Sequence, residues 1–96
     1  MYYVVLTRDA IKDLKKLRSG NLSEKARQIV ELIKEDPFCQ PYESLKYDLS
    51  GMYSKRINIQ HRIVYTVDSK EVVINGISYC GTVKILSMWT HYERQK

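Results

Sequence analysis

The spacing of apolar residues changes once along the chain, and this change restricts the possible folds more than any other feature. Between residues 8 and 36, apolar side chains recur every three or four positions, which is the spacing of amphipathic helices. After Lys46, apolar and polar residues alternate, as in strands with one buried face. Helices followed by strands are typical of an α+β domain, in which the helices cover one face of an antiparallel sheet.

Two helices are expected before residue 37. Thr7 is the expected N-cap of the first, whose apolar stripe stops at Ser19-Gly20. Asn21 can cap the second, with Glu24 three positions on in a capping box. Pro37 ends it, because the residue before a proline is pushed out of the helical region. The short gap between the two helices predicts an antiparallel helical hairpin.

Strands are expected on both sides of the helical hairpin, and a loop is expected at Phe38–Ser44. The predicted order is β-α-α-β-β-β(-β) in one domain over residues 1–96, with a twisted antiparallel sheet and both helices on one face. The expected strands are Tyr2–Leu6, Met52–Ile59, Arg62–Val67, Glu71–Ile77 and Thr82–Trp89.

Composition excludes several classes of protein. The chain of 96 residues is 44% hydrophobic, too apolar for a disordered chain, yet it contains no apolar run of the roughly 18–20 residues that a membrane span needs. The segment 1–6 lacks a basic start and reaches the charged Arg8 too soon for a secretory signal. Two cysteines imply no disulfide framework, so we expect a reducing, cytoplasmic setting.

The net charge of +5 is concentrated in the second half of the chain. Residues 46–96 carry 8 Lys and Arg against 4 Asp and Glu. A small basic domain suggests a polyanionic partner, most often nucleic acid, and equally allows an acidic protein. Cys39 and Cys80 stand alone, and His61 and His91 are far apart, so neither a metal site nor a cofactor is expected.

Two stretches carry a family resemblance. Residues 45–65 contain Leu49-Ser50-Gly51, the basic pair Lys55-Arg56 and the run His61-Arg62-Ile63-Val64-Tyr65. The last expected strand closes on His91-Tyr92. Together they resemble the RelE/ParE toxin superfamily of type II toxin–antitoxin systems, and most closely its YoeB (Txe) branch. The resemblance implies a RelE-like microbial RNase-type fold and a ribosome-dependent, metal-independent mRNA endonuclease. It also implies a cognate antitoxin and a homodimer.

The residues needed for RNA cleavage are present. Cleavage without a metal requires a base for the 2′-OH, a cation for the charge building on phosphorus, and an acid for the leaving oxygen. By the resemblance, Glu43 is the general base, Arg62 contacts the scissile phosphate, His91 is the general acid, and Tyr92 orients the phosphate or stacks on a base. The expected RNA-binding residues are Lys46, Lys55 and Arg56.

Each of these residues also has an ordinary explanation. Glu43 can be a solvated carboxylate, Arg62 can simply pair with Asp48 or Glu43, and His91 can be an idle exposed side chain. Two other functions are therefore open. One is a ParE-like gyrase inhibitor, which shares the fold without the cleavage residues. The other is a non-catalytic RNA- or ribosome-binding protein, because phosphate contacts explain affinity without reaction.

The chain departs from the YoeB pattern in two places. About a dozen extra residues, Ser69–Gly81, stand before the last strand, and they predict an extended hairpin at one end of the sheet. The tail Glu93–Lys96 follows His91-Tyr92, where such chains often stop.

Overall fold

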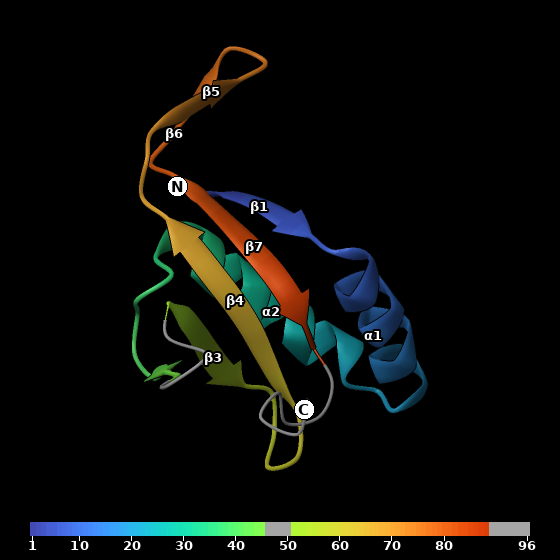
Figure 1. Ribbon diagram of the computed structural model, residues 1–96. Helices are drawn as coiled ribbons and strands as arrows, with labels where there is room; N and C mark the ends of the chain where they lie inside the picture. Colours follow the sequence, from blue (N-terminus) through green and yellow to red (C-terminus); the bar gives the residue numbers. More distant parts are fainter. Residues whose placement is uncertain (46–50, 89–96) are drawn as a thin grey trace.

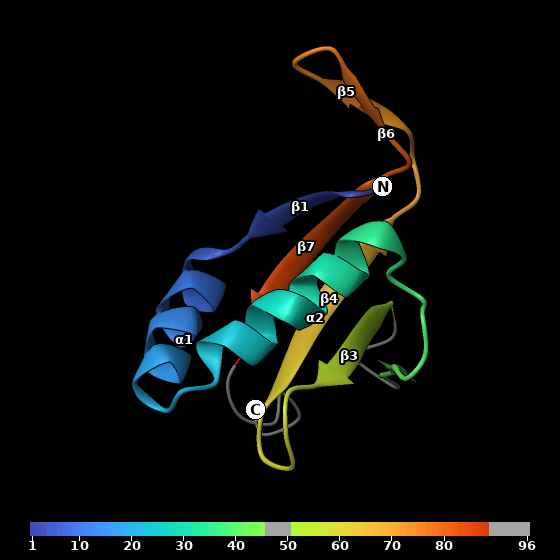
Figure 2. The same cartoon turned by 180° about the vertical axis from the view of Figure 1, so that it is seen from behind.

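The computed structural model describes residues 1–45 and 51–88. Two helices lie on one face of a five-stranded sheet, and a separate two-stranded hairpin projects beyond one end of that sheet (Figures 1 and 2). No helix in the described ranges is long and apolar enough to cross a membrane. The elements are β1 (Tyr3–Leu6), α1 (Arg8–Ser19), α2 (Ser23–Glu35), β2 (Glu43–Ser44), β3 (Met52–Arg56), β4 (Arg62–Asp68), β5 (Val72–Ile74), β6 (Ile77–Tyr79) and β7 (Thr82–Ser87).

The helical hairpin is confirmed, but one of its two expected caps is wrong. The Thr7 hydroxyl accepts a hydrogen bond from the Ala10 N–H at 3.1 Å, as expected for the N-cap of α1. Asn21 does not cap α2. It has φ of +63° and belongs to the tight turn between the helices, so the N-cap falls on Leu22, which makes no side-chain capping bond.

The strand order in the large sheet is β1-β7-β4-β3-β2. The expected α+β fold is confirmed, with antiparallel pairing between all neighbours except β1 and β7, which run parallel at one edge. The two ends of the described chain therefore meet in the sheet. The short β2 forms the opposite edge, next to β3.

Alternation along β3 and β4 assigns each side chain to one face of the sheet. Tyr65, Ile63 and the half-buried Tyr53 face the helices, where they join a core that includes Leu17 and Ile33. The Tyr65 hydroxyl donates to the Pro37 carbonyl at 2.7 Å, which ties β4 to the end of α2.

Tyr65→Phe is expected to lower the free energy of unfolding by about 1–3 kcal/mol at neutral pH, because the buried Pro37 carbonyl loses its donor. Burial raises the pKa of Tyr65 above its ordinary value of about 10. The unfolded phenol therefore ionises first, and the stabilisation present below about pH 10 is lost as the pH rises further. Denaturant titrations should show a constant difference between the proteins from pH 6 to 9 and a shrinking one above about pH 10. A variant as stable as the wild type throughout would contradict this role for the bond.

The expected strand Glu71–Ile77 is wrong, because it turns back on itself in the middle. Asn75 and Gly76 both have positive φ, at +52° and +80°, which suits the two-residue turn of a hairpin. β5 and β6 pair on either side of this turn and join no strand of the large sheet. The extended hairpin expected in this segment is thus present at one end of the sheet, as Figure 1 shows.

The expected strand Met52–Ile59 is too long. β3 ends at Arg56, and Asn58 then forms a tight turn in which its side-chain oxygen accepts from the N–H groups of Gln60 and His61. Ile59 at the tip is 88% exposed. β7 likewise ends at Ser87, two residues before the expected end at Trp89. Trp89 itself lies outside the described residues.

Candidate active site

Glu43 and Arg62, expected as base and phosphate-binding cation, lie together. Arg62 Nη1 donates to Glu43 Oε1 at 3.0 Å. The Arg62 side chain is only 10% exposed, whereas that of Glu43 is 56% exposed. Of the two partners that the sequence left open for Arg62, Glu43 makes the contact, and Asp48 lies outside the described residues. The pair combines a guanidinium held in place with a carboxylate that is open to solvent.

Strand register explains why residues 19 positions apart meet. Glu43 of β2 pairs with Ser54 of β3, and Ser54 pairs with Val64 of β4. Arg62 lies two residues before Val64 and therefore on the same face of the sheet. From there Nη1 also approaches the buried Ser54 Oγ, at 3.4 Å. The family motifs did not indicate this contact of Ser54, although alternation along a strand places Ser54 on the same side as Arg56.

A second cation lies on this face. Arg56 is the direct cross-strand partner of Arg62, so both side chains leave the sheet on the same side. Like charges directly opposite each other in a sheet are unfavourable unless an anion compensates them. Arg56 is exposed and Arg62 is buried, so one guanidinium is accessible while the other is fixed. This pattern favours binding of a phosphate group.

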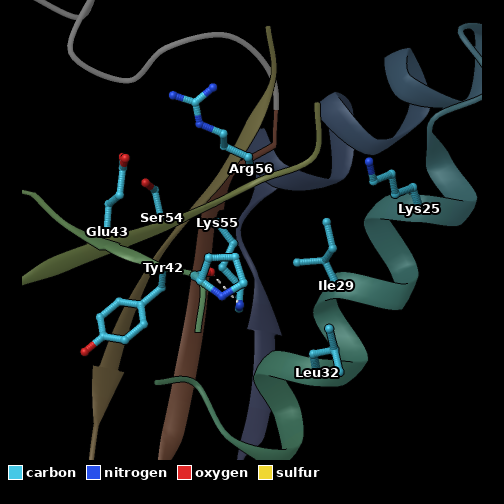
Figure 3. A pocket seen from close by; sticks show the side chains of 9 residues that line it. Lys25, Ile29, Leu32, Tyr42, Glu43, Ser54, Lys55 and Arg56 are labelled. Carbon is cyan, nitrogen blue, oxygen red and sulfur yellow. Dashed lines mark hydrogen bonds between the residues drawn. The ribbon is translucent and has the colours of Figure 1, made fainter. Parts of the chain in front are cut away.

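Lys55 does not lie where an RNA-binding residue was expected. It is adjacent to Arg56 and so points to the opposite face, towards the helices. Its ammonium donates to the carbonyls of Cys39 at 2.9 Å and Pro41 at 2.8 Å, and the residue is only 5% exposed. Figure 3 shows Lys55 and Arg56 leaving β3 on opposite sides. An ammonium already bound to two backbone carbonyls of this loop is poorly placed to present its charge to RNA, so this geometry does not favour the expected RNA contact of Lys55.

A hollow of about 300 Å³ opens beside Glu43. It lies between α2 and the strands β2 and β3, as Figure 3 shows, and it combines an apolar wall with positive charge and one aromatic ring. Such a combination can hold a base and its phosphate. The sequence did not predict that Lys25 and Tyr42 line this hollow. No local sequence pattern indicates that α2 packs beside the loop before β2. The lining residues are Lys25, Ile29, Leu32, Pro41, Tyr42, Glu43, Ser54, Lys55 and Arg56.

The other expected site residues, Lys46, His91 and Tyr92, lie outside the described residues. Within residues 1–45 and 51–88, no three His, Cys, Asp or Glu side chains come together as a possible metal site.

Comparison with known proteins decides the family. The sequence model described as YoeB-like toxin of bacterial type II toxin–antitoxin system matches residues 6–80. The chain belongs to this family. A curated member, Toxin YoeB of Synechocystis sp., is 38% identical over 75 residues, which are 76% of this chain and 74% of the relative. The family predicted from the motifs is thereby confirmed, and this chain is a toxin of the YoeB family.

Solved structures of YoeB toxins share the fold. A YoeB dimer from Staphylococcus aureus is 28% identical, with a TM-score of 0.72, and the match covers 95% of this chain and 98% of that one. A YoeB–YefM complex from the same species is 28% identical, with a TM-score of 0.67 and coverage of 96% and 99%. A YoeB/ParE toxin from Agrobacterium tumefaciens has a TM-score of 0.76 at 24% identity, covers 94% and 99%, and shows the fold alone.

Proposed function

We propose that this YoeB-family toxin is an endoribonuclease that cleaves mRNA in the ribosomal A site and so inhibits translation. The observation that carries the proposal is the 3.0 Å contact between Arg62 and Glu43, with Arg56 directly opposite Arg62. A carboxylate beside two guanidinium groups supplies a proton acceptor and a phosphate site in one place.

The proposed reaction uses side chains for every proton transfer. Glu43 takes the proton of the 2′-OH, and the freed oxygen attacks the adjacent phosphorus. Arg62 stabilises the negative charge that builds on the phosphate oxygens. The bond from phosphorus to the 5′-oxygen then breaks, and His91 gives its proton to that oxygen. The products are a 2′,3′-cyclic phosphate and a 5′-OH end.

Three further residues have supporting roles in the proposed reaction. We propose that Tyr92 orients the phosphate or stacks on a base, and that Lys46 and Arg56 bind the RNA backbone. Because the 2′-OH is the nucleophile, the reaction is restricted to RNA.

Ribosome dependence can be tested by incubating the purified toxin with one mRNA, either free or on translating ribosomes, and mapping the RNA ends. If the ribosome supplies part of the substrate positioning, as this proposal holds, cleavage of free RNA should be about 100-fold slower or more. Equal rates on both substrates would contradict ribosome dependence. An absence of cleavage on both would contradict the nuclease itself.

The proposed partners follow from the family. We infer a cognate antitoxin whose segment folds across the basic face near Arg62 and blocks it, and a homodimer of the toxin. Staphylococcus aureus YoeB has been solved both as a dimer and in complex with YefM. Arg62 left open in a purified toxin–antitoxin complex would contradict inhibition by occlusion.

A further inference from the structure

We propose that Lys55 is a positioning residue for the general base: its buried ammonium fixes the loop that leads into Glu43. This inference rests on the proposed function, because it concerns the geometry of the same site. It assigns Lys55 a role in the rate of the reaction instead of a role in RNA binding.

The contacts of Lys55 lie immediately before Glu43 in the chain. Its Nζ bridges two carbonyls of the loop between α2 and β2, those of Cys39 and Pro41. Pro41 precedes Glu43 by only two residues. Because Lys55 itself belongs to β3, the bridge ties this loop to the sheet that also holds Arg62 and Ser54.

Glu43 depends on this bridge because its own strand is short. β2 has two residues and pairs only with β3, at an edge of the sheet. Short edge strands hold their residues weakly. On the loop side, the Tyr42 ring packs edge-on against both Phe38 and Tyr53, which limits sideways movement of the same segment. The Lys55 bridge adds two hydrogen bonds from a charged donor, which are stronger than neutral ones.

The burial of Lys55 indicates why a lysine is required. A buried ammonium is tolerated only where acceptors compensate its lost hydration, and here two carbonyls do so. An apolar side chain of the same length would leave both carbonyls without this donor. The loop would then shift, and displacement of a catalytic group by about 1 Å costs about 100-fold in rate.

The test compares Lys55→Met with the wild type on mRNA-programmed ribosomes, measuring kcat and KM. We expect kcat to fall about 10- to 100-fold with KM changed less than about twofold. The matched controls are Lys15→Met, an exposed lysine on α1 that should leave both constants unchanged, and Arg56→Met, which should raise KM and weaken its salt dependence. If Lys55→Met instead raises KM as Arg56→Met does, Lys55 binds RNA and the proposal is wrong.

A double variant separates positioning from general damage to the fold. If Lys55 acts through Glu43, then Lys55→Met should lower kcat less than about twofold in a Glu43→Gln background. An equal fractional loss in both backgrounds would mean a structural effect and would overturn the proposal. Lys55→Arg keeps charged donors and should recover a large part of kcat. Lys55→Arg also provides a test if the Met variant does not fold. A folded Lys55→Arg variant whose kcat is as low as that of Glu43→Gln would contradict the proposal, because the charged donors would be present without restoring the rate.

The same set of variants distinguishes failure of this inference from failure of the proposed function. Absence of mRNA cleavage by the wild type would overturn the proposed function, whereas wild-type kcat in Glu43→Gln would remove Glu43 from the mechanism and with it the premise of this inference. Loss of activity in Glu43→Gln together with wild-type kcat in Lys55→Met would overturn only the positioning role.

Discussion

Arg62→Ala is expected to lower kcat on ribosome-bound mRNA by about 1000-fold, the largest effect of any substitution among the described residues. Loss of a preorganised charge at the point where negative charge builds up costs about 100- to 1000-fold, and Arg62 is held ready by Glu43 and Ser54. Single-turnover cleavage, followed by mapping of the mRNA ends, measures the effect. Circular dichroism melting confirms that the variant is folded.

Arg62→Lys is the matched control for charge. It keeps the cation but loses the planar fork, which can contact a phosphate through two donors at once. We expect an intermediate loss of about 10- to 100-fold. An Arg62→Ala enzyme within a few-fold of the wild type would show that Arg62 is only the structural partner of Glu43.

Glu43→Gln is expected to have the second largest effect, a loss of about 300-fold in kcat, which lies within the range for a general base. Glutamine has nearly the same shape, and its side-chain oxygen can still accept from Arg62, so the pair keeps its geometry. The amide has no basicity and cannot take the proton of the 2′-OH. Because the lost interaction belongs to the transition state, kcat and kcat/KM should fall together.

Glu31→Gln, an exposed carboxylate on α2, is the control for a loss of charge and should be unaffected. A Glu43→Gln variant with an unchanged kcat and a raised KM would contradict the role of Glu43 as a base. It would indicate that Glu43 only shapes the binding surface.

Much of the fold could be predicted because it depends on local patterns. The spacing of apolar residues located both helices, and Thr7 and Pro37 marked two of their boundaries correctly. The errors in the predicted elements also came from local patterns that allow two interpretations. Asn21 can serve either as a cap or as a left-handed turn residue, and only the tight gap between the helices favours the turn. The Asn75-Gly76 turn was overlooked within a β-branched run, although this dipeptide is a strong hairpin signal.

The residue types of the candidate site could be proposed from the sequence, but their geometry could not. The family motifs suggested Glu43 and Arg62 as site residues, whereas their contact depends on the register of three strands, which no local pattern determines. Lys55 shows the same limit. Its basic charge suggested RNA binding, and alternation placed it opposite Arg56, but only the loop after α2 decides that its ammonium is buried. The parallel pairing of β1 with β7 is likewise a long-range contact.

The most direct test of the central claim is to map new mRNA 5′ ends in bacteria after induction of the wild type and of a folded Arg62→Ala, His91→Ala double variant. We predict growth arrest with new 5′-OH ends for the wild type, and neither arrest nor new ends for the double variant. Arrest that persists in the double variant without new mRNA ends would contradict RNA cleavage as the toxic activity. It would indicate gyrase inhibition or simple binding instead.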